Sequence, residues 1–398
     1  MTSRAKRVIG LILAVVLVLG VAAVIIITRV GAGSSAPKGP HNLTVVNGVI
    51  GSEKKPFFSD PQVKALFAKH GYDVEVVTAG SRQIATTFDL SHEDFAFPSS
   101  APAAQKLKQK TGVSTAYSPF YSPMAIATFT PIVTLLQNAG MASQDASGTW
   151  HLDMAKYLAA VAAGTRWNQL PGADKLYNSS RSLLISSTDV RQSNSAAMYL
   201  SIASYVANQQ NVVSSDAQQS AVIDQMASLF LSQGFSASSS EEPFDDYLSQ
   251  GIGSKPMVMI YEAQFLGEEM NADTKSAITP DMVLMYPSPN VLSKHTVVPL
   301  TKNGDAIGQL LSNDPTLARL AAQYGFRPAD PSVFTSVLKA HNITEPPAPV
   351  DIIDPPSYET LESMIESISA RYDSPAAGDL SSQAPTDPAE PESPTPTP

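Results

Sequence analysis

The chain has 398 residues, of which 43% are hydrophobic and none is cysteine. This length allows two domains with cores of their own. The missing cysteine excludes disulfides, thiolate metal sites, a cysteine nucleophile and a lipid-modified N-terminal cysteine. The formal charge is −10, and residues 1–40 carry five of the 26 basic residues and no acidic one, which leaves 21 basic against 36 acidic residues in the body. A body so acidic lacks the basic surface that nucleic-acid binding requires, so no nucleic-acid partner is expected.

The N-terminal segment predicts a membrane anchor. Val8–Ile27 is an unbroken run of apolar or glycine residues, and basic residues precede it. Its length matches a membrane-spanning helix and exceeds the usual core of a cleaved signal peptide. We therefore predict a cytoplasmic segment at 1–7, a transmembrane signal anchor at 8–28 and a linker at 29–41. The expected location is the cell membrane, single-pass, with an extracytoplasmic body. Cleavage within the small residues Gly31–Ala36 is the alternative.

Residues 43–100 predict an alternating pattern of strands and helices. Strands are expected at Leu43–Val46, Tyr72–Val77 and Phe95–Phe97. A helix between the first two strands begins at Asp60-Pro61, which combines an N-cap with a first-turn proline, and ends at Gly71. This alternation predicts an α/β fold with a mixed, mostly parallel sheet, in which ligands bind at loops that follow the strands.

A strand, a polar turn and a helix are predicted within Ser182–Ala207. Leu183–Ile185 is a short apolar run, residues 186–195 are mostly hydroxyl and amide side chains, and the helix that follows carries Met198 and Ile202 on one face. Such a turn presents backbone N–H groups and short donors at one point, which suits a small polar or anionic ligand.

Further elements extend to residue 372. Residues 117–130, interrupted by Pro119 and Pro123, are interpreted as a crossover into a second domain. The other expected helices and strands are Asp153–Ala163, Asp216–Gln233, Met257–Tyr261, Met282–Tyr286, Thr296–Leu300, Asp314–Gly325 and Tyr358–Tyr372. Residues 346–373 hold a proline-rich link and the last of these helices. Residues 374–398 consist mainly of Pro, Ser, Thr, Ala, Asp and Glu, a composition that predicts disorder.

Several segments in order resemble bacterial extracellular solute-binding proteins of the type II periplasmic-binding-protein fold, the group that includes molybdate- and sulfate-like binders of ABC transporters. The matching segments are LTVVNGVIGSEKKPFFSDPQV, GSRQIA, DFAFPSS, YSPMAIA, TDVRQSNSAAMY, MVMIYEAQ, and DMVLMYPSP through AAQYGFRP. The resemblance implies two lobes, each a sheet flanked by helices, with lobe 1 at 42–122 and 281–345 and lobe 2 at 123–280. It also implies a cleft between the lobes, a small polar solute or oxyanion as ligand, and an ABC permease as partner.

The loops at the predicted strand ends supply the candidate ligand-binding residues. Short hydroxyls and backbone amides donate hydrogen bonds to an oxyanion without adding charge, and an arginine gives a bidentate contact to a carboxylate, phosphate or sulfate. The candidates are Gly51, Ser52, Ser81, Arg82, Ser99 and Ser100 on one wall, and Thr188, Asp189, Arg191, Ser193, Asn194, Ser195, Tyr261 and Glu262 on the other.

Structural roles are the alternative for these residues. Residues 193–195 are also typical helix caps, Ser99-Ser100 is a typical turn, the two arginines suit an exposed surface, and Tyr261 suits a core. A glutamate at position 262 disfavours a bare anion and favours a ligand with an amine or hydroxyl. At the level of function, the alternative is a non-transport interaction or sensing module with a degenerate pocket.

No catalytic or cofactor motif was found. Ser-x-x-Lys, Lys-Thr-Gly and Ser-x-Asn matches of penicillin-recognising serine enzymes occur in the wrong order, because Lys110–Gly112 precedes Ser288–Asn290. The six histidines have no metal-ligand spacing. We therefore predict a binding protein that is not an enzyme, with no cofactor and no metal.

Overall fold

The computed structural model describes residues 43–234, 237–271, 277–348 and 350–372. The chain divides into two compact units, Met1–Thr44 and Val45–Pro398. All of the helices and strands described here lie in the second unit, except that β1 begins at Thr44. The predicted anchor at 8–28 and the predicted tail at 374–398 fall outside the described residues. None of the helices in the described ranges has the length and hydropathy needed to cross a membrane.

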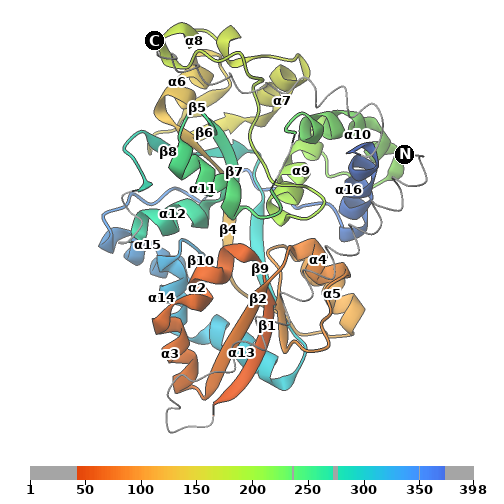
Figure 1. The fold of residues 1–398 in the computed structure, drawn as a ribbon, viewed down its shortest axis with the longest axis vertical. Coiled ribbons are helices and arrows are strands. Elements are labelled where there is room, and N and C mark those ends of the chain that lie inside the picture. Colours follow the sequence, from red (N-terminus) through yellow and green to blue (C-terminus); the bar gives the residue numbers. More distant parts are fainter. Residues whose placement is uncertain (1–42, 235–236, 272–276, 349, 373–398) are drawn as a thin grey trace, which may run out of the picture. The chain divides into compact units, whose positions relative to one another are not determined.

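The described strands form one ten-stranded sheet with the order β2-β1-β3-β9-β4-β8-β6-β5, and β7 and β10 also pair with β4 (Figure 1). Their bounds are β1 Thr44–Ile50, β2 Tyr72–Thr78, β3 Phe95–Phe97, β4 Tyr117–Phe129, β5 Ala142–Gln144, β6 Trp150–Asp153, β7 Met257–Tyr261, β8 Met282–Ser288, β9 Leu292–Pro299 and β10 Arg327–Pro328.

The long strand β4 joins two lobes. Its first half, Tyr117–Pro123, pairs with β9, whereas its second half, Met124–Phe129, pairs with β7 and β8. We name the elements around β1, β2 and β3 the first lobe and those around β5 to β8 the second lobe. The predicted crossover at 117–130 is therefore a single strand, with Pro119 and Pro123 inside it.

The expectation of a mostly parallel sheet is wrong. Only the β1–β3 and β6–β8 pairings are parallel among those whose registers are described, and the others are antiparallel. The long strand β4 lies antiparallel to all four strands that pair with it, β7, β8, β9 and β10, and β9 also lies antiparallel to β3, so antiparallel pairing predominates.

The first lobe buries both faces of its sheet. Val46 and Ile50 of β1 point into one cluster with seven phenylalanines, while Val49 points into the other, as expected for side chains that alternate along a strand. The helices of this lobe are α2 Lys55–Ser59, α3 Pro61–Lys69, α4 Ser81–Thr86, α5 Ala101–Thr111, α13 Lys302–Asn313 and α14 Pro315–Gln323, and a short 3₁₀ helix, η1, covers Ser52–Lys54.

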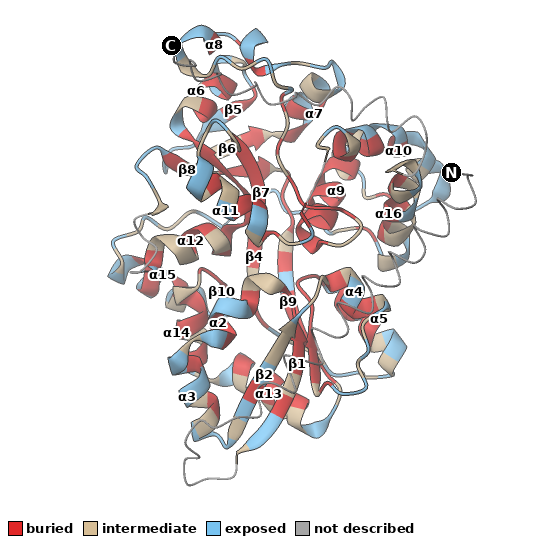
Figure 2. Cartoon of the chain, in the orientation of Figure 1, coloured by how far each residue is buried: buried red, intermediate tan, exposed pale blue. Residues whose placement is uncertain are grey.

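The second lobe has the larger core, and α9 is buried over its first eleven residues (Figure 2). Its helices are α6 Thr130–Asn138, α7 Met154–Ala162, α8 Ala173–Leu176, α9 Asn194–Ala207, α10 Asp216–Leu231 and α11 Glu241–Gln250, with the 3₁₀ helix η2 at Trp167–Gln169. Two more helices, α12 Glu262–Met270 and α15 Pro331–Ala340, form a small core with α14 beside the point where β10 pairs with β4.

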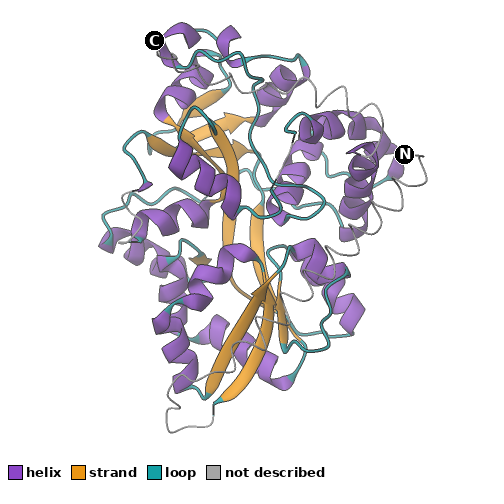
Figure 3. Ribbon diagram, in the orientation of Figure 1, coloured by secondary structure: helices purple, strands orange, loops and turns teal. Residues whose placement is uncertain are grey.

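The last of the described helices, α16 Tyr358–Tyr372, contacts both lobes (Figure 3). Its apolar side chains Leu361, Met364, Ile365 and Ile368 belong to the second-lobe core, where α16 packs on α10 and α9. Its first turn reaches α5 of the first lobe, where the Lys106 ammonium lies 5.2 Å from the centre of the Tyr358 ring. A helix that follows both lobes in the chain therefore connects them.

Three predicted strands differ from the structure. Leu183–Ile185 is not a strand, because only isolated bridges flank it, Arg166 to Ser182 and Ser186 to Val258. β1 continues to Ile50, because Gly48 leaves room for the Phe95 ring of the paired strand. β9 begins at Leu292 because the whole segment pairs with β4.

Candidate functional site

The beginning of α9 meets the loop after β3. Asn194 Nδ2 donates to the backbone oxygen of Ser99 at 3.2 Å and to the Tyr261 hydroxyl at 3.0 Å. The Ser293 hydroxyl of β9 also donates to the Ser99 oxygen. The turn before α9 thus faces the first-lobe loops, and residues of both lobes converge on Ser99.

A buried ion pair lies beside this point, on η1. Lys54 Nζ lies 2.5 Å from Glu53 Oε1, 2.7 Å from Ser99 Oγ and 3.1 Å from His295 Nδ1. The Ser99 hydroxyl in turn donates to Glu53 Oε1. The Lys54 side chain is fully buried and that of Glu53 is 5% exposed. An ammonium ion removed from water in this way needs the carboxylate as its counter-ion.

Burial acts on all three ionisable groups of this cluster. It lowers the pKa of Lys54, which Glu53 only partly offsets. Burial alone would raise the pKa of Glu53, but Lys54 and His295 outweigh it and hold that pKa well below its usual range. Burial and the Lys54 charge lower the pKa of His295 to about 4, so its ring is neutral near pH 7.

His295 sits among aromatic rings. The centres of Phe120, Tyr261 and Phe326 lie 5.5, 5.8 and 5.1 Å from the centre of its ring. Its Nε2 is buried and has no hydrogen-bond partner among the described residues, while Nδ1 faces Lys54. The rings exclude water from the ion pair on this side.

Gly51 follows β1 directly and leaves room for the carboxylate. A Cβ at this position would lie 2.4 Å from Ser99 Oγ and 2.7 Å from each oxygen of Glu53. The backbone conformation itself is an ordinary extended one, so only the close approach requires glycine. Gly51, Lys54, Ser99 and His295 together form what we name the carboxylate cradle.

The lobes touch directly around the cradle. The Ser52 and Ser239 hydroxyls are 2.9 Å apart, and a Cβ on Gly80 would lie 2.1 Å from the backbone oxygen of Gln192. Glu241 of α11 lies next to this contact, since its backbone N–H donates to Ser239 Oγ at 3.2 Å. Burial and then the Glu53 charge raise the pKa of Glu241. Separating the lobes would break each of these contacts.

The two predicted arginines bind other groups of the protein. Arg82 Nε donates to both oxygens of Glu362 on α16 at 2.8 Å, and its Nη1 donates to the backbone oxygen of Arg191 at 3.0 Å. Arg191 pairs with Asp189 of its own loop, Nη2 to Oδ2 at 2.6 Å, and stacks 4.3 Å over the Tyr372 ring. The structure therefore places these guanidinium groups at the contact with α16.

The other predicted hydroxyls hold the two walls in place. Ser81 Oγ accepts from the Ser99 backbone N–H at 2.9 Å, and Ser100 precedes α5. In the second lobe Ser195 lies 2.9 Å from Thr188 and 3.0 Å from Ser193. Ser193 occupies the N-cap position, but its side chain makes no capping hydrogen bond.

Glu262 lies apart from the cradle, at the start of α12. It is fully buried, and its Oε1 accepts from Arg327 Nε at 2.7 Å while Oε2 accepts from Arg327 Nη2 at 2.9 Å and from the Tyr286 hydroxyl at 2.6 Å. This pair connects α12, β8 and β10 near the crossing between the lobes.

Sequence reasoning missed Glu53, Lys54, Ser293 and His295. Glu53 and Lys54 lie just after the buried end of β1, so two charges at the end of a strand were a usable signal. His295 gave no such signal, because its role depends on a partner 241 residues away in the chain.

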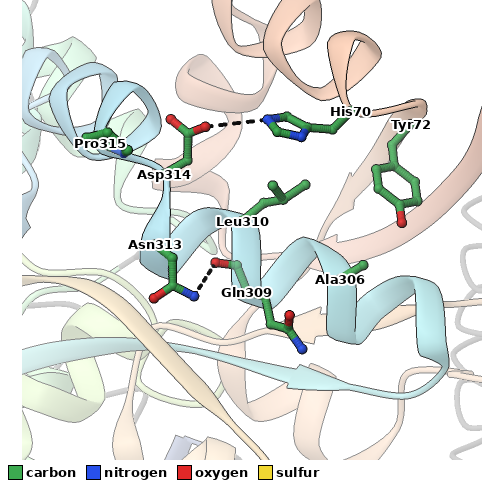
Figure 4. Close-up of a pocket in the computed structure, with 8 residues that line it drawn as sticks. All are labelled: His70, Tyr72, Ala306, Gln309, Leu310, Asn313, Asp314 and Pro315. Carbon is green, nitrogen blue, oxygen red and sulfur yellow. Dashed lines mark hydrogen bonds and ion pairs between the residues drawn. The ribbon is translucent and has the colours of Figure 1, made fainter.

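A separate groove of about 510 Å³ opens in the first lobe between the end of α3 and the helices α13 and α14 (Figure 4). His70 Nε2 lies 3.5 Å from Asp314 Oδ2 across it, and the Asn313 amide donates to the Gln309 backbone oxygen at 2.9 Å. No predicted ligand-binding residue lines it. Within the described ranges, no three His, Asp or Glu side chains are grouped as metal ligands would be.

The fold is similar to that of several solved binding proteins, although no sequence comparison finds a match. No protein-family model and no curated protein sequence matches the chain. Among solved structures, the chain is similar to apo ferric ion-binding protein A from Pasteurella haemolytica, with TM-score 0.52, 10% identity and coverage of 83% of this chain and 99% of that one. It is also similar to a periplasmic thiamin-binding protein (TM-score 0.50, 11% identity, 86% and 100% covered) and to the ferric binding protein of Campylobacter jejuni (TM-score 0.50, 9% identity, 85% and 98% covered).

The fold is that of the type II periplasmic-binding proteins. In this periplasmic-binding fold β4 and β9 are the strands that pass between the lobes, and the cradle lies where β1, β3 and β9 face α9. Identities near 10% show the fold alone, so any ligand has to be argued from the residues of this chain.

Proposed function

We propose that this chain is an extracytoplasmic solute-binding protein that captures a small polar or anionic ligand between its two lobes. Residues 8–28 would anchor it in the membrane, and an ABC-type importer would receive the ligand. The observation that carries the proposal is the convergence of Lys54 and Ser99 of the first lobe with Asn194 and Tyr261 of the second in one buried cluster. A charged donor, a hydroxyl and an amide gathered between two lobes match what an anionic ligand needs.

Capture would proceed by a hinge motion about the strands that join the lobes. Asn194 reaches Ser99 only while the lobes touch, so a ligand beside Ser99 would be covered on closure. Opening would separate Ser52 from Ser239 and Arg82 from the Arg191 backbone. The Glu262–Arg327 pair lies near the crossing strands and would stay intact during the motion.

A second candidate is a non-transport interaction or sensing module whose pocket is degenerate. It is favoured by the Glu53 carboxylate, which already pairs with Lys54, and by α16, which links the lobes through Glu362 and Arg82. In this candidate the lobes stay together and no solute enters.

A thermal-shift screen of the full chain distinguishes the two candidates. The panel contains oxyanions, carboxylates, amino acids and sugars, each titrated over a wide concentration range. A ligand that binds only the folded protein raises the melting temperature, by the equivalent of about 2.7 kcal/mol at a hundred times its Kd. We expect one class to raise it in a saturable way. A panel without any saturable shift contradicts solute capture and supports the second candidate.

Replacing Asn194 tests the location of the site. Asn194→Ala removes the donor to Ser99 and Tyr261, so we expect the ligand-induced shift to disappear, with a loss of about 1–2 kcal/mol in the free energy of unfolding. Ser336→Ala on the exposed side of α15 is the control and should keep the full shift. A normal shift in Asn194→Ala would place the ligand elsewhere.

A further inference from the structure

We infer that the interlobe site takes a ligand carboxylate, which replaces the Glu53 carboxylate in the cradle formed by Gly51, Lys54, Ser99 and His295. This inference rests on the proposed solute-binding function and names the chemical class of the ligand. In the present structure Glu53 fills the cradle with a carboxylate that belongs to the chain itself.

The shape of the cradle fits a carboxylate. Lys54 Nζ at 2.5 Å, His295 Nδ1 at 3.3 Å and the Ser99 hydroxyl all contact the same oxygen, Glu53 Oε1. Both carboxylate oxygens come within 2.7 Å of the position that a Gly51 Cβ would occupy. The cradle therefore has room for a planar group with two oxygens and has donors directed at one of them.

The charge of the cradle selects an anion. The Lys54 side chain is fully buried and is wedged against the Phe97 ring, with its Nζ 4.9 Å from the ring centre. A neutral ligand in place of Glu53 would leave this ammonium ion buried without a counter-ion, which is strongly unfavourable. A ligand carboxylate carries the same charge as the Glu53 carboxylate that it replaces, so Lys54 keeps a counter-ion after the exchange.

Glu53 is placed to leave the cradle without unfolding the protein. It lies on η1, next to Lys54 in the chain, and its three described polar contacts all fall on Oε1. While the lobes touch, Ser239 contacts Ser52 of this turn, and the backbone N–H of Glu241 donates to the same Ser239 hydroxyl. When the lobes separate, the Glu53 side chain can rotate into water, and Glu241 no longer opposes a negative charge there.

Chemical rescue tests the inference in the full chain. Glu53→Ala empties the cradle and leaves Lys54 unpaired, so we expect a lower melting temperature than in the unaltered protein. Formate and acetate should then raise it in a saturable manner by about 2–4 °C or more, whereas chloride and sulfate at equal ionic strength should not. If Glu53→Ala folds poorly, the yield of folded protein refolded with formate is compared with the yield obtained with chloride.

Two variants isolate the cradle. Glu53→Gln fills it with a neutral group of the same shape, and Glu53→Ala with Lys54→Met removes the cation. Formate should rescue neither. A formate effect of equal size in all three variants, or no effect in Glu53→Ala by either measurement, would overturn the inference. Equal rescue by sulfate would also overturn it, because the cradle would then accept oxyanions without preference for a carboxylate.

The unaltered protein separates this inference from the proposed function. If it binds only ligands that lack a carboxylate, solute capture stands and the carboxylate inference fails. If Glu53→Ala is rescued by formate while the unaltered protein binds no class of solute, the cradle is correctly described. In that outcome the Glu53 carboxylate occupies the cradle permanently and excludes other carboxylates from it, and solute capture fails.

Discussion

Two ion pairs are buried among the described residues, and they are built differently. Arg327 approaches Glu262 in parallel, with one nitrogen on each carboxylate oxygen, and the Tyr286 hydroxyl adds a third donor. Lys54 approaches Glu53 at a single oxygen, which it shares with Ser99 and His295. The first pair joins residues 65 apart in the chain, whereas the second joins neighbours on one turn.

This difference separates a structural pair from an exchangeable one. Breaking Glu262–Arg327 would remove a contact that joins α12, β8 and β10, because each partner lies on a different element. Releasing Glu53 from Lys54 changes only side-chain positions on η1. Displacing the carboxylate of a bidentate pair breaks two charge-assisted hydrogen bonds at once, so the Glu262 carboxylate is harder to exchange for another anion than the Glu53 carboxylate.

The largest expected effect follows from breaking the structural pair. Arg327→Met leaves the buried Glu262 carboxylate with the Tyr286 hydroxyl alone, and we expect the free energy of unfolding to fall by about 3–5 kcal/mol in urea denaturation. Formate should give no rescue, in contrast to Glu53→Ala.

The exposed Arg319→Met on α14 is the matched control and should change stability by less than about 0.5 kcal/mol. The double variant Glu262→Met with Arg327→Met should recover part of the loss, because no buried charge remains. A single variant as stable as the control would show that the pair is dispensable.

An intermediate effect is expected from pH. Burial and the Lys54 charge lower the pKa of His295 from 6.5 to about 4. Between these values the unfolded chain takes up a proton that the folded chain does not, so stability falls as pH falls from about 6.5 to 4, by roughly 3 kcal/mol. Below about pH 4 this histidine contributes no further loss.

His295→Phe removes the titrating group and fits among the surrounding aromatic rings. Urea denaturation at a series of pH values should show a flatter stability profile for this variant between pH 6.5 and 4. The depressed pKa of Glu53 acts in a different window, because its contribution is lost only below the ordinary pKa of a glutamate. Identical profiles would show that His295 is not held neutral.

The smallest effect on stability is expected at the α16 contact. Arg82 and Glu362 are 32% and 16% exposed, so Arg82→Ala should cost no more than about 1 kcal/mol. Because Arg82 joins the lobes, amide hydrogen exchange at the start of α9 should become faster. Arg371→Ala is the control, since Arg371 pairs with Asp224 inside the second lobe and should leave that exchange unchanged.

The sequence predicted elements that are specified locally. Asp60-Pro61 and Asp314-Pro315 start α3 and α14 through side-chain caps, and the apolar spacing of α16 places four residues in the core. Leu183–Ile185 was predicted as a strand because an apolar run resembles one, but no neighbouring strand extends along it. Local pattern cannot show whether a partner is present.

The site was predictable only in outline. The loops at Ser99 and Asn194 were identified because polar residues follow a strand and precede a helix, and the structure brings these two together. The partners of Arg82 and Glu262 could not be identified in this way. Glu362 and Arg327 are distant from them in the sequence and come close only in the folded chain. Whether the predicted residues bind a ligand stays a prediction.

The position of α16 has a kinetic consequence. If the lobes open and close as proposed, this helix stabilises the closed form through contacts that do not involve the cradle, equally with and without a ligand. For a ligand that enters only between separated lobes, a rarer open form lowers the rates of association and dissociation by the same factor. Once the closed form predominates, the dissociation constant is unaffected. The C-terminal helix would thus set how long a solute is retained and leave unchanged how strongly it is bound.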